Sequence, residues 1–238
     1  MTYFQYAIAS AVLIVSLIIS VVAQIKVQSA YSKYSKVESK CGLTGGELAQ
    51  KIVDAAGLNV RVNTINGNLT DNYNSLDKTL NISRANYNNA SVAALGVVAH
   101  ECGHALQDVK NYAPLKIRQF VVRVSNNISR FLLPLLIVGL LFNFMYIGGV
   151  TGQVFIWIAV GFYALSVLAN LATLPVEINA SNRALKMLQG FEIMDDGELE
   201  GAREVLSAAA FTYLASLLVS FAFLLRFLLI ALSSVNRR

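Results

Sequence analysis

The chain of 238 residues alternates between long apolar stretches and one extended polar region. Four stretches are uncharged or nearly so, and each is about as long as the ~20 apolar residues that a helix needs to cross a bilayer. They cover residues 3–24, 131–150, 154–174 and 208–232, and only the last contains a charged residue, Arg226. The pattern predicts a mainly α integral membrane protein with four transmembrane helices.

The polar region between the first two stretches, residues 26–130, predicts a small water-facing α+β domain. Thr44 followed by Glu47 predicts a capping box that begins a short helix, and Gly57 would end it in a left-handed turn. Residues 60–65 and 79–83 are β-branched runs separated by turn-forming residues, so we expect a β-hairpin or a small sheet. An exposed strand at residues 79–83 would also be able to pair with an extended substrate.

A helix over residues 92–109, with Ser91 as its N-cap, contains the only two histidines of the chain. They belong to an HExxH motif formed by His100, Glu101, Cys102, Gly103 and His104. Residues four apart lie on one face of a helix, so both imidazoles can reach one metal ion while Glu101 lies beside its open position. The spacing predicts one zinc ion bound by His100 and His104, with Glu101 as general base.

Catalytic zinc usually has three protein ligands, and no third histidine is present. Asp108 follows on the same helix, but it lies too far along that face to join both histidines, and we expect a solvated or capping residue. The acidic residues 192–200 are typical of a solvated loop. Glu177 is the preferred third ligand, because it is an ionisable residue at the end of the third apolar stretch and on the same membrane face as the motif.

Several sequence blocks resemble the YugP-type neutral zinc metallopeptidases of bacterial membranes and, more distantly, the HtpX-type membrane proteases. The blocks are residues 42–47, 69–73, 98–105, 174–181 and 208–213, so the resemblance covers nearly the whole chain. It implies a zincin-like domain with a gluzincin-like ligand set of His100, His104 and Glu177. HtpX-type proteins have an aspartate where this chain has Ser181, so Ser181 or Asn179 would orient the imidazoles instead.

Tyr213 stands at the start of the last apolar stretch and is the candidate for stabilising the oxyanion. It also fits an aromatic anchor at the membrane interface, and Arg183 is an alternative oxyanion donor. Cys102 is interpreted as a small buried side chain, and two cysteines do not indicate a disulfide framework.

Composition supports the membrane assignment, with 55% hydrophobic residues and a mean hydropathy of +0.55. The net charge of +5 does not indicate nucleic-acid binding, because the basic residues form no recognisable binding module. They flank the apolar stretches instead, which by the positive-inside tendency places residues 26–130 and the active site on the cytoplasmic side of the cell membrane. Nothing in the sequence indicates an oligomeric state.

The predicted organisation has five parts: an N-terminal signal anchor (1–25), the domain with the motif helix (26–130), a transmembrane hairpin (131–175), a membrane-proximal segment with the third ligand (176–206), and a last transmembrane helix with its tail (207–238). The predicted function is that of a zinc-dependent metalloendopeptidase acting on membrane or membrane-proximal proteins. The alternatives are a transporter or channel, and a metal-dependent scaffold without turnover.

Overall fold

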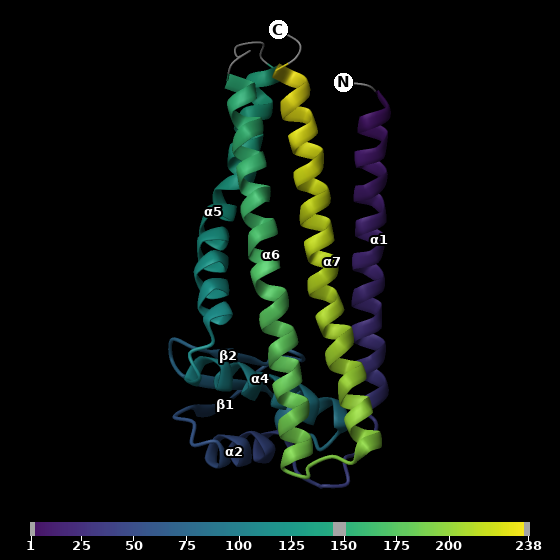
Figure 1. Ribbon diagram of the computed structural model, residues 1–238, viewed down its shortest axis with the longest axis vertical. Helices are drawn as coiled ribbons and strands as arrows, with labels where there is room; N and C mark the ends of the chain where they lie inside the picture. Colours follow the sequence, from purple (N-terminus) through teal and green to yellow (C-terminus); the bar gives the residue numbers. More distant parts are fainter. Residues whose placement is uncertain (1–2, 145–150, 236–238) are drawn as a thin grey trace. The chain divides into compact units, whose positions relative to one another are not determined.

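The computed structural model describes residues 3–144 and 151–235, and these are mainly helical (Figure 1). The long helices are α1 (Tyr3–Tyr34), α5 (Ala113–Phe144), α6 (Thr151–Gly190) and α7 (Asp196–Val235). Between α1 and α5 lie α2 (Gly45–Ala55), β1 (Arg61–Ile65), β2 (Asn72–Asn74), β3 (Thr79–Ser83), α3 (Arg84–Tyr87) and α4 (Val92–Val109). The chain forms two compact units, which the long helices connect.

One unit comprises residues 1–22, 116–174 and 213–238. Among its described residues, Tyr163 of α6 stacks on Phe223 and Phe227 of α7, with ring centroids 5.2 and 5.0 Å apart. Asn170 of α6 donates a hydrogen bond to the Ser220 hydroxyl of α7. These contacts join the apolar parts of α6 and α7.

Three helices in the described part of the chain are long and apolar enough to cross a membrane: Gln5–Tyr34, Val154–Gly190 and Asp196–Leu232. They contain the predicted spans 154–174 and 208–232 in full and the span 3–24 from residue 5 onwards. The remaining one, residues 131–150, is helical to Phe144, and its last residues, 145–150, lie outside the described residues. The helices also extend well beyond the apolar stretches, so their polar ends belong to the other unit.

That other unit comprises residues 23–115 and 175–212 and contains a small sheet with strand order β1-β3-β2. β1 pairs with β3 in parallel, and β2 pairs with β3 antiparallel. The expected hairpin or small sheet is therefore confirmed as a sheet, in which the two predicted strands pair in parallel and so do not form a hairpin. The proposed pairing of a substrate with residues 79–83 is wrong, because β3 is the central strand and has a neighbour on each side.

The helix predictions in this unit are confirmed. The Thr44 hydroxyl accepts from the Glu47 backbone N–H while the Glu47 carboxylate accepts from the Thr44 backbone, which completes the capping box of α2. Gly57 has φ +59°, as the predicted left-handed turn requires. The Ser91 hydroxyl caps α4, which spans the predicted residues 92–109.

The core of this unit brings α4 and the second half of α6 together with the sheet and α2. Its fully buried side chains include Leu48 and Ile52 of α2, Leu80 of β3, Leu95 of α4 and Leu188 of α6. Burying each such side chain stabilises the fold by about 1.5–3 kcal/mol. The motif helix and the segment with Glu177 are thus held in one packed core.

Candidate metal centre

The two imidazoles lie one helical turn apart on α4, as the HExxH spacing predicts. Their ring centroids are 4.8 Å apart and the rings are nearly perpendicular, at 87°. His104 is only 7% exposed, whereas His100 is half-buried. This arrangement turns one nitrogen of each ring towards the same point.

Glu177 of α6 lies beside these nitrogens and is only 2% exposed. Its Oε2 atom is 3.2 Å from Nε2 of His100 and 3.6 Å from Nε2 of His104. The three residues offer ligand atoms that all lie within 4.8 Å of one another. Tetrahedral zinc with bonds of about 2.0–2.1 Å separates its ligand atoms by about 3.3 Å, so both carboxylate distances fit a shared ion.

Gly103 allows α4 and α6 to approach closely at this centre. A Cβ atom at this position would lie 2.6 Å from the backbone carbonyl oxygen of Ala180. Ala180 is one turn beyond Glu177 on α6, so any larger residue at position 103 would displace the segment that carries the carboxylate. The glycine inside the motif is therefore explained by helix packing.

Each imidazole has a hydrogen-bond partner for its other nitrogen. Nδ1 of His100 lies 3.1 Å from the Ser181 hydroxyl, and Nδ1 of His104 lies 3.0 Å from Oε1 of Gln107. Gln107 in turn contacts Asn179. Such contacts fix ring orientation and leave Nε2 available to a metal. The sequence pointed to Ser181 and Asn179, but it missed Gln107, whose three-residue spacing from His104 was the available signal.

Glu101 contacts the neighbouring edge strand. Its Oε2 accepts a hydrogen bond of 2.9 Å from the backbone N–H of Tyr73 in β2. Burial raises the pKa of the Glu101 carboxyl, against the opposing effect of His104 and His100. A carboxylate with a raised pKa is better suited to accept a proton near neutral pH than an ordinary surface glutamate.

Asp71 holds β2 in place beside Glu101. Its carboxylate accepts hydrogen bonds from the backbone N–H and the hydroxyl of Ser83 and from the side-chain amide of Asn86. The Tyr31 hydroxyl of α1 donates to the other end of the Asn86 amide, at 2.6 Å. This network connects α1 to the strand whose backbone contacts Glu101.

Three further residues that the sequence analysis considered, Asp108, Arg183 and Cys102, lie outside the proposed ligand set. Asp108 is not a solvated or capping residue, since its carboxylate accepts from the Tyr73 hydroxyl and pairs with Lys78. Arg183 donates to Asn179 from Nε, and its guanidinium lies 5.8 Å from the centre of the Tyr112 ring. Cys102 is fully buried, as predicted, and burial raises the pKa of its thiol.

Tyr213 belongs to the unit of the apolar helices, whereas all three predicted ligands belong to the other unit. Its catalytic role stays a prediction.

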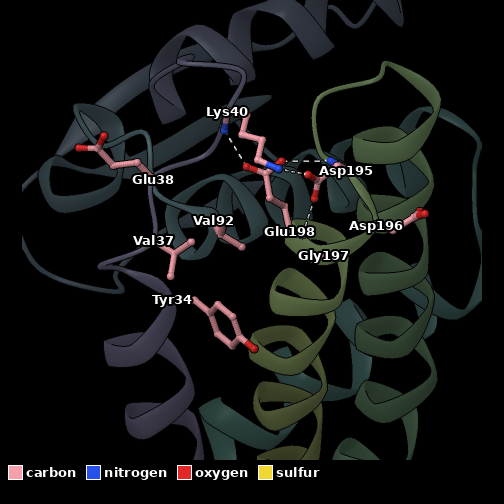
Figure 2. Close-up of a pocket in the computed structure, with 9 residues that line it drawn as sticks. All are labelled: Tyr34, Val37, Glu38, Lys40, Val92, Asp195, Asp196, Gly197 and Glu198. Atoms are coloured by element: carbon pink, nitrogen blue, oxygen red, sulfur yellow. Dashed lines mark hydrogen bonds and ion pairs between the residues drawn. The ribbon is translucent and has the colours of Figure 1, made fainter.

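The acidic residues 192–200 are not a solvated loop, because α7 begins at Asp196. Asp195 and Glu198 cap this helix through reciprocal hydrogen bonds to each other's backbone N–H groups. Lys40 pairs with Asp195, and its backbone N–H donates to Glu198 (Figure 2). A pocket of about 550 Å³ lies here, lined by Tyr34, Val37, Glu38, Lys40, Val92, Asp195, Asp196, Gly197 and Glu198. These carboxylates thus have structural partners already.

A packed helical core thus brings the two histidines of the HExxH motif together with a buried glutamate, and this group of three could hold a metal ion. The chain belongs to the family described as "Putative neutral zinc metallopeptidase", whose model matches residues 9–232. It is 40% identical over 212 residues to "Putative membrane protease YugP" of Bacillus subtilis (strain 168), covering 89% of this chain and 91% of that protein. No solved structure matches. With three long apolar helices among its described residues, the chain is a multi-pass membrane protein.

Proposed function

We propose that the chain is a zinc-dependent metalloendopeptidase that hydrolyses peptide bonds in membrane or membrane-proximal proteins. The observation that supports this most directly is the convergence of His100, His104 and Glu177, whose ligand atoms lie within 4.8 Å of one another. The donor set of two imidazoles and one carboxylate is that of a catalytic zinc site, which leaves one position open. When bound, zinc would lower the pKa of a water molecule and polarise the scissile carbonyl.

Glu101 would then carry out the proton transfer. Glu101 would accept a proton from the attacking water and deliver it to the leaving amine nitrogen, as the peptide C–N bond breaks and a C–O bond forms. Its Oε2 is held by the Tyr73 backbone N–H, so Oε1 is the oxygen assigned to the transfer. The hydrogen bonds from Ser181 and Gln107 to the imidazoles would keep both Nε2 atoms directed at the ion. Tyr213 remains the proposed oxyanion donor.

A membrane-proximal substrate is supported by the position of Glu177 on α6. It follows the apolar stretch 154–174 by three residues of the same helix, about 5 Å along its axis. The cleavage site of a substrate would therefore be presented close to the bilayer surface. The basic residues that flank the apolar stretches favour the cytoplasmic side.

The test is proteolysis of an unfolded casein-type substrate by the purified, detergent-solubilised protein. Hydrolysis should stop when a chelator removes the metal and return when zinc is added. Glu101→Gln should keep zinc and lose activity, whereas Glu192→Gln, at an exposed site, should keep both. Turnover by Glu101→Gln at the wild-type rate would refute the mechanism. Zinc binding without turnover by the wild type would favour the scaffold, and the absence of both would favour a transporter or channel.

A further inference from the structure

Gln107 is a fully buried side chain of α4 that contacts a proposed ligand without being one. Its Nε2 donates to the backbone carbonyl of Val176 at 2.8 Å and to Oδ1 of Asn179 at 3.0 Å. A backbone carbonyl only accepts, so the amide nitrogen must face Val176. The amide oxygen must then face Nδ1 of His104, which lies 3.0 Å away.

Arg183 fixes the direction of the next hydrogen bond, the one between Gln107 and Asn179, in the same way. Its Nε–H can only donate, and it donates to Oδ1 of Asn179 at 2.7 Å, which fixes the orientation of that amide as well. Each hydrogen bond in the series therefore has one possible direction. At its end, His104 must donate Nδ1–H to Gln107, which leaves the lone pair of Nε2 directed towards Glu177.

We infer that Gln107 is a positioning residue with two tasks. It holds His104 in the tautomer that can bind a metal through Nε2, and it ties α4 to Val176, the residue beside Glu177. The inference rests on the proposed function, because the tautomer matters only if Nε2 of His104 binds an ion. Loss of a residue that orients a ligand typically weakens metal affinity by about 10–100-fold.

The experiment compares zinc affinity, the visible spectrum of the cobalt(II)-substituted protein and the unfolding temperature of the metal-free protein. Gln107→Met keeps the length of the side chain but removes every hydrogen bond. Gln107→Glu keeps an acceptor for His104 and loses the donors to Val176. The matched control is Gln50→Met on α2, where the exposed amide donates a hydrogen bond to the Asp54 carboxylate.

We expect zinc affinity to fall by about 10–100-fold in Gln107→Met and by less in Gln107→Glu. The cobalt(II) bands should change in Gln107→Met, which a packing defect alone would not cause. Unchanged affinity and spectrum in Gln107→Met would overturn the role of Gln107, as would an equal or larger loss in Gln107→Glu. If the wild type itself binds neither metal, the proposed metal site fails, and the role of Gln107 fails with it.

A second, independent inference concerns the charge of the unit formed by residues 1–22, 116–174 and 213–238. It contains none of the 14 acidic residues of the chain but seven of its 19 basic residues. Four of the seven, Lys116, Arg118, Arg123 and Arg130, lie in residues 116–130 of α5. This segment of the helix therefore carries a concentrated positive charge.

The same segment of α5 exposes large apolar side chains. Phe120 is 70% exposed, Ile117 57% and Ile128 44%. At 100° per residue these three lie in one sector of the helix, and Lys116 and Arg123, both exposed, lie at its edge. In water the basic edge would be well solvated but the apolar sector would not. In the hydrocarbon core the apolar sector would be well solvated but the basic edge would not.

We propose that this face of α5, residues 116–128, lies in the headgroup layer of the bilayer and binds anionic phospholipids. Apolar side chains with adjoining basic residues are typical of helices at that boundary, where basic side chains extend towards lipid phosphates. Charge complementarity selects anionic over zwitterionic lipid, since each basic residue near such a surface adds attraction equivalent to about fivefold in affinity. This proposal does not depend on the metal site.

Depth is measured first, with a nitroxide at position 120 in the full-length protein in liposomes. Cys41→Ser removes the accessible thiol, while Cys102 is fully buried and stays unlabelled. The label in Phe120→Cys should collide more with oxygen than with a water-soluble nickel chelate. The control, Lys51→Cys on the exposed side of α2, should show the reverse. A label at position 120 that behaves like the one at position 51 would overturn the interfacial location.

Lipid preference is measured second, from the immobilised fractions of spin-labelled phosphatidylglycerol and phosphatidylcholine. The variant K116Q/R118Q/R123Q should lower the preference for phosphatidylglycerol at least several-fold. The control K51Q/R61Q/R84Q removes the same charge from exposed positions of the other unit and should leave the preference unchanged. Equal effects of both variants, or no effect of the first, would overturn the proposed lipid site.

Discussion

Replacing Gly103 by alanine tests whether the approach of α4 to α6 sets the geometry of the metal centre. The new Cβ would lie 2.6 Å from the Ala180 carbonyl oxygen, 3.2 Å from its carbonyl carbon and 3.3 Å from its Cα. All three atoms belong to backbone, so no side-chain rotation relieves the contact. The helices would have to separate by at least about 0.5 Å to restore ordinary packing distances.

A shift of this size is large compared with what a metal site tolerates. Metal–ligand distances normally vary by about 0.2 Å, and Glu177 lies one turn from Ala180 on the helix that would move. Overpacking typically costs about 1–3 kcal/mol. If that cost falls on the metal-bound geometry, the dissociation constant for zinc should rise by roughly 5- to 150-fold.

The assay is chelator competition for zinc, together with thermal unfolding of the metal-free protein. Gly96→Ala is the matched control, because it lies on the same helix and its Cβ would meet the Ala202 Cβ at an ordinary 3.4 Å. Both alanines gain about 1 kcal/mol of helix propensity. Zinc affinity should fall only in Gly103→Ala. Wild-type affinity in Gly103→Ala would show that this packing contact does not position the ligands.

Three further predictions follow from single contacts. Ser181→Ala removes the partner of His100 Nδ1 and should weaken zinc binding about tenfold by competition assay; an unchanged constant would exclude that role. Asp71→Ala removes an acceptor of three hydrogen bonds and should cost about 2–4 kcal/mol in a denaturant titration; a change below 0.5 kcal/mol, roughly that of a surface substitution, would contradict it. Hydrogen bonds from Thr44 hold the pKa of the Glu47 carboxyl below its ordinary value. The ionised carboxylate therefore stabilises the fold at pH values above the ordinary pKa, and this stabilisation is lost as the pH falls through the lower pKa of the folded state. Glu47→Gln should remove that acid dependence from thermal unfolding curves, and identical curves for variant and wild type would refute it.

Local signals predicted the motif helix well. Ser91 as N-cap and the apolar residues that follow gave α4 its bounds of Val92–Val109, and Thr44 with Glu47 gave the start of α2. Both signals act over three or four residues, so they are visible in one stretch of sequence. The candidate ligands were also chosen from local features, a four-residue spacing and a glutamate at the end of an apolar stretch.

The sheet could not be predicted in the same way, because strand order depends on contacts between distant residues. β2 consists of Asn72–Asn74, which lack the β-branched pattern of a strand, and it forms because β3 offers a free edge. Gln107 was missed for a related reason. Its role depends on Val176 and Asn179 of α6, which are 69 and 72 residues away in the chain.

The central claim is that one zinc ion is shared by His100, His104 and Glu177, and metal analysis of purified protein tests it most directly. The wild type should contain about one zinc per chain, in keeping with a site of two imidazoles and one carboxylate. Glu177→Ala should lose most of it, while Glu200→Ala, at an exposed position of α7, should keep it. Full zinc occupancy in Glu177→Ala, or a wild type that purifies without zinc and does not take it up, would contradict the account.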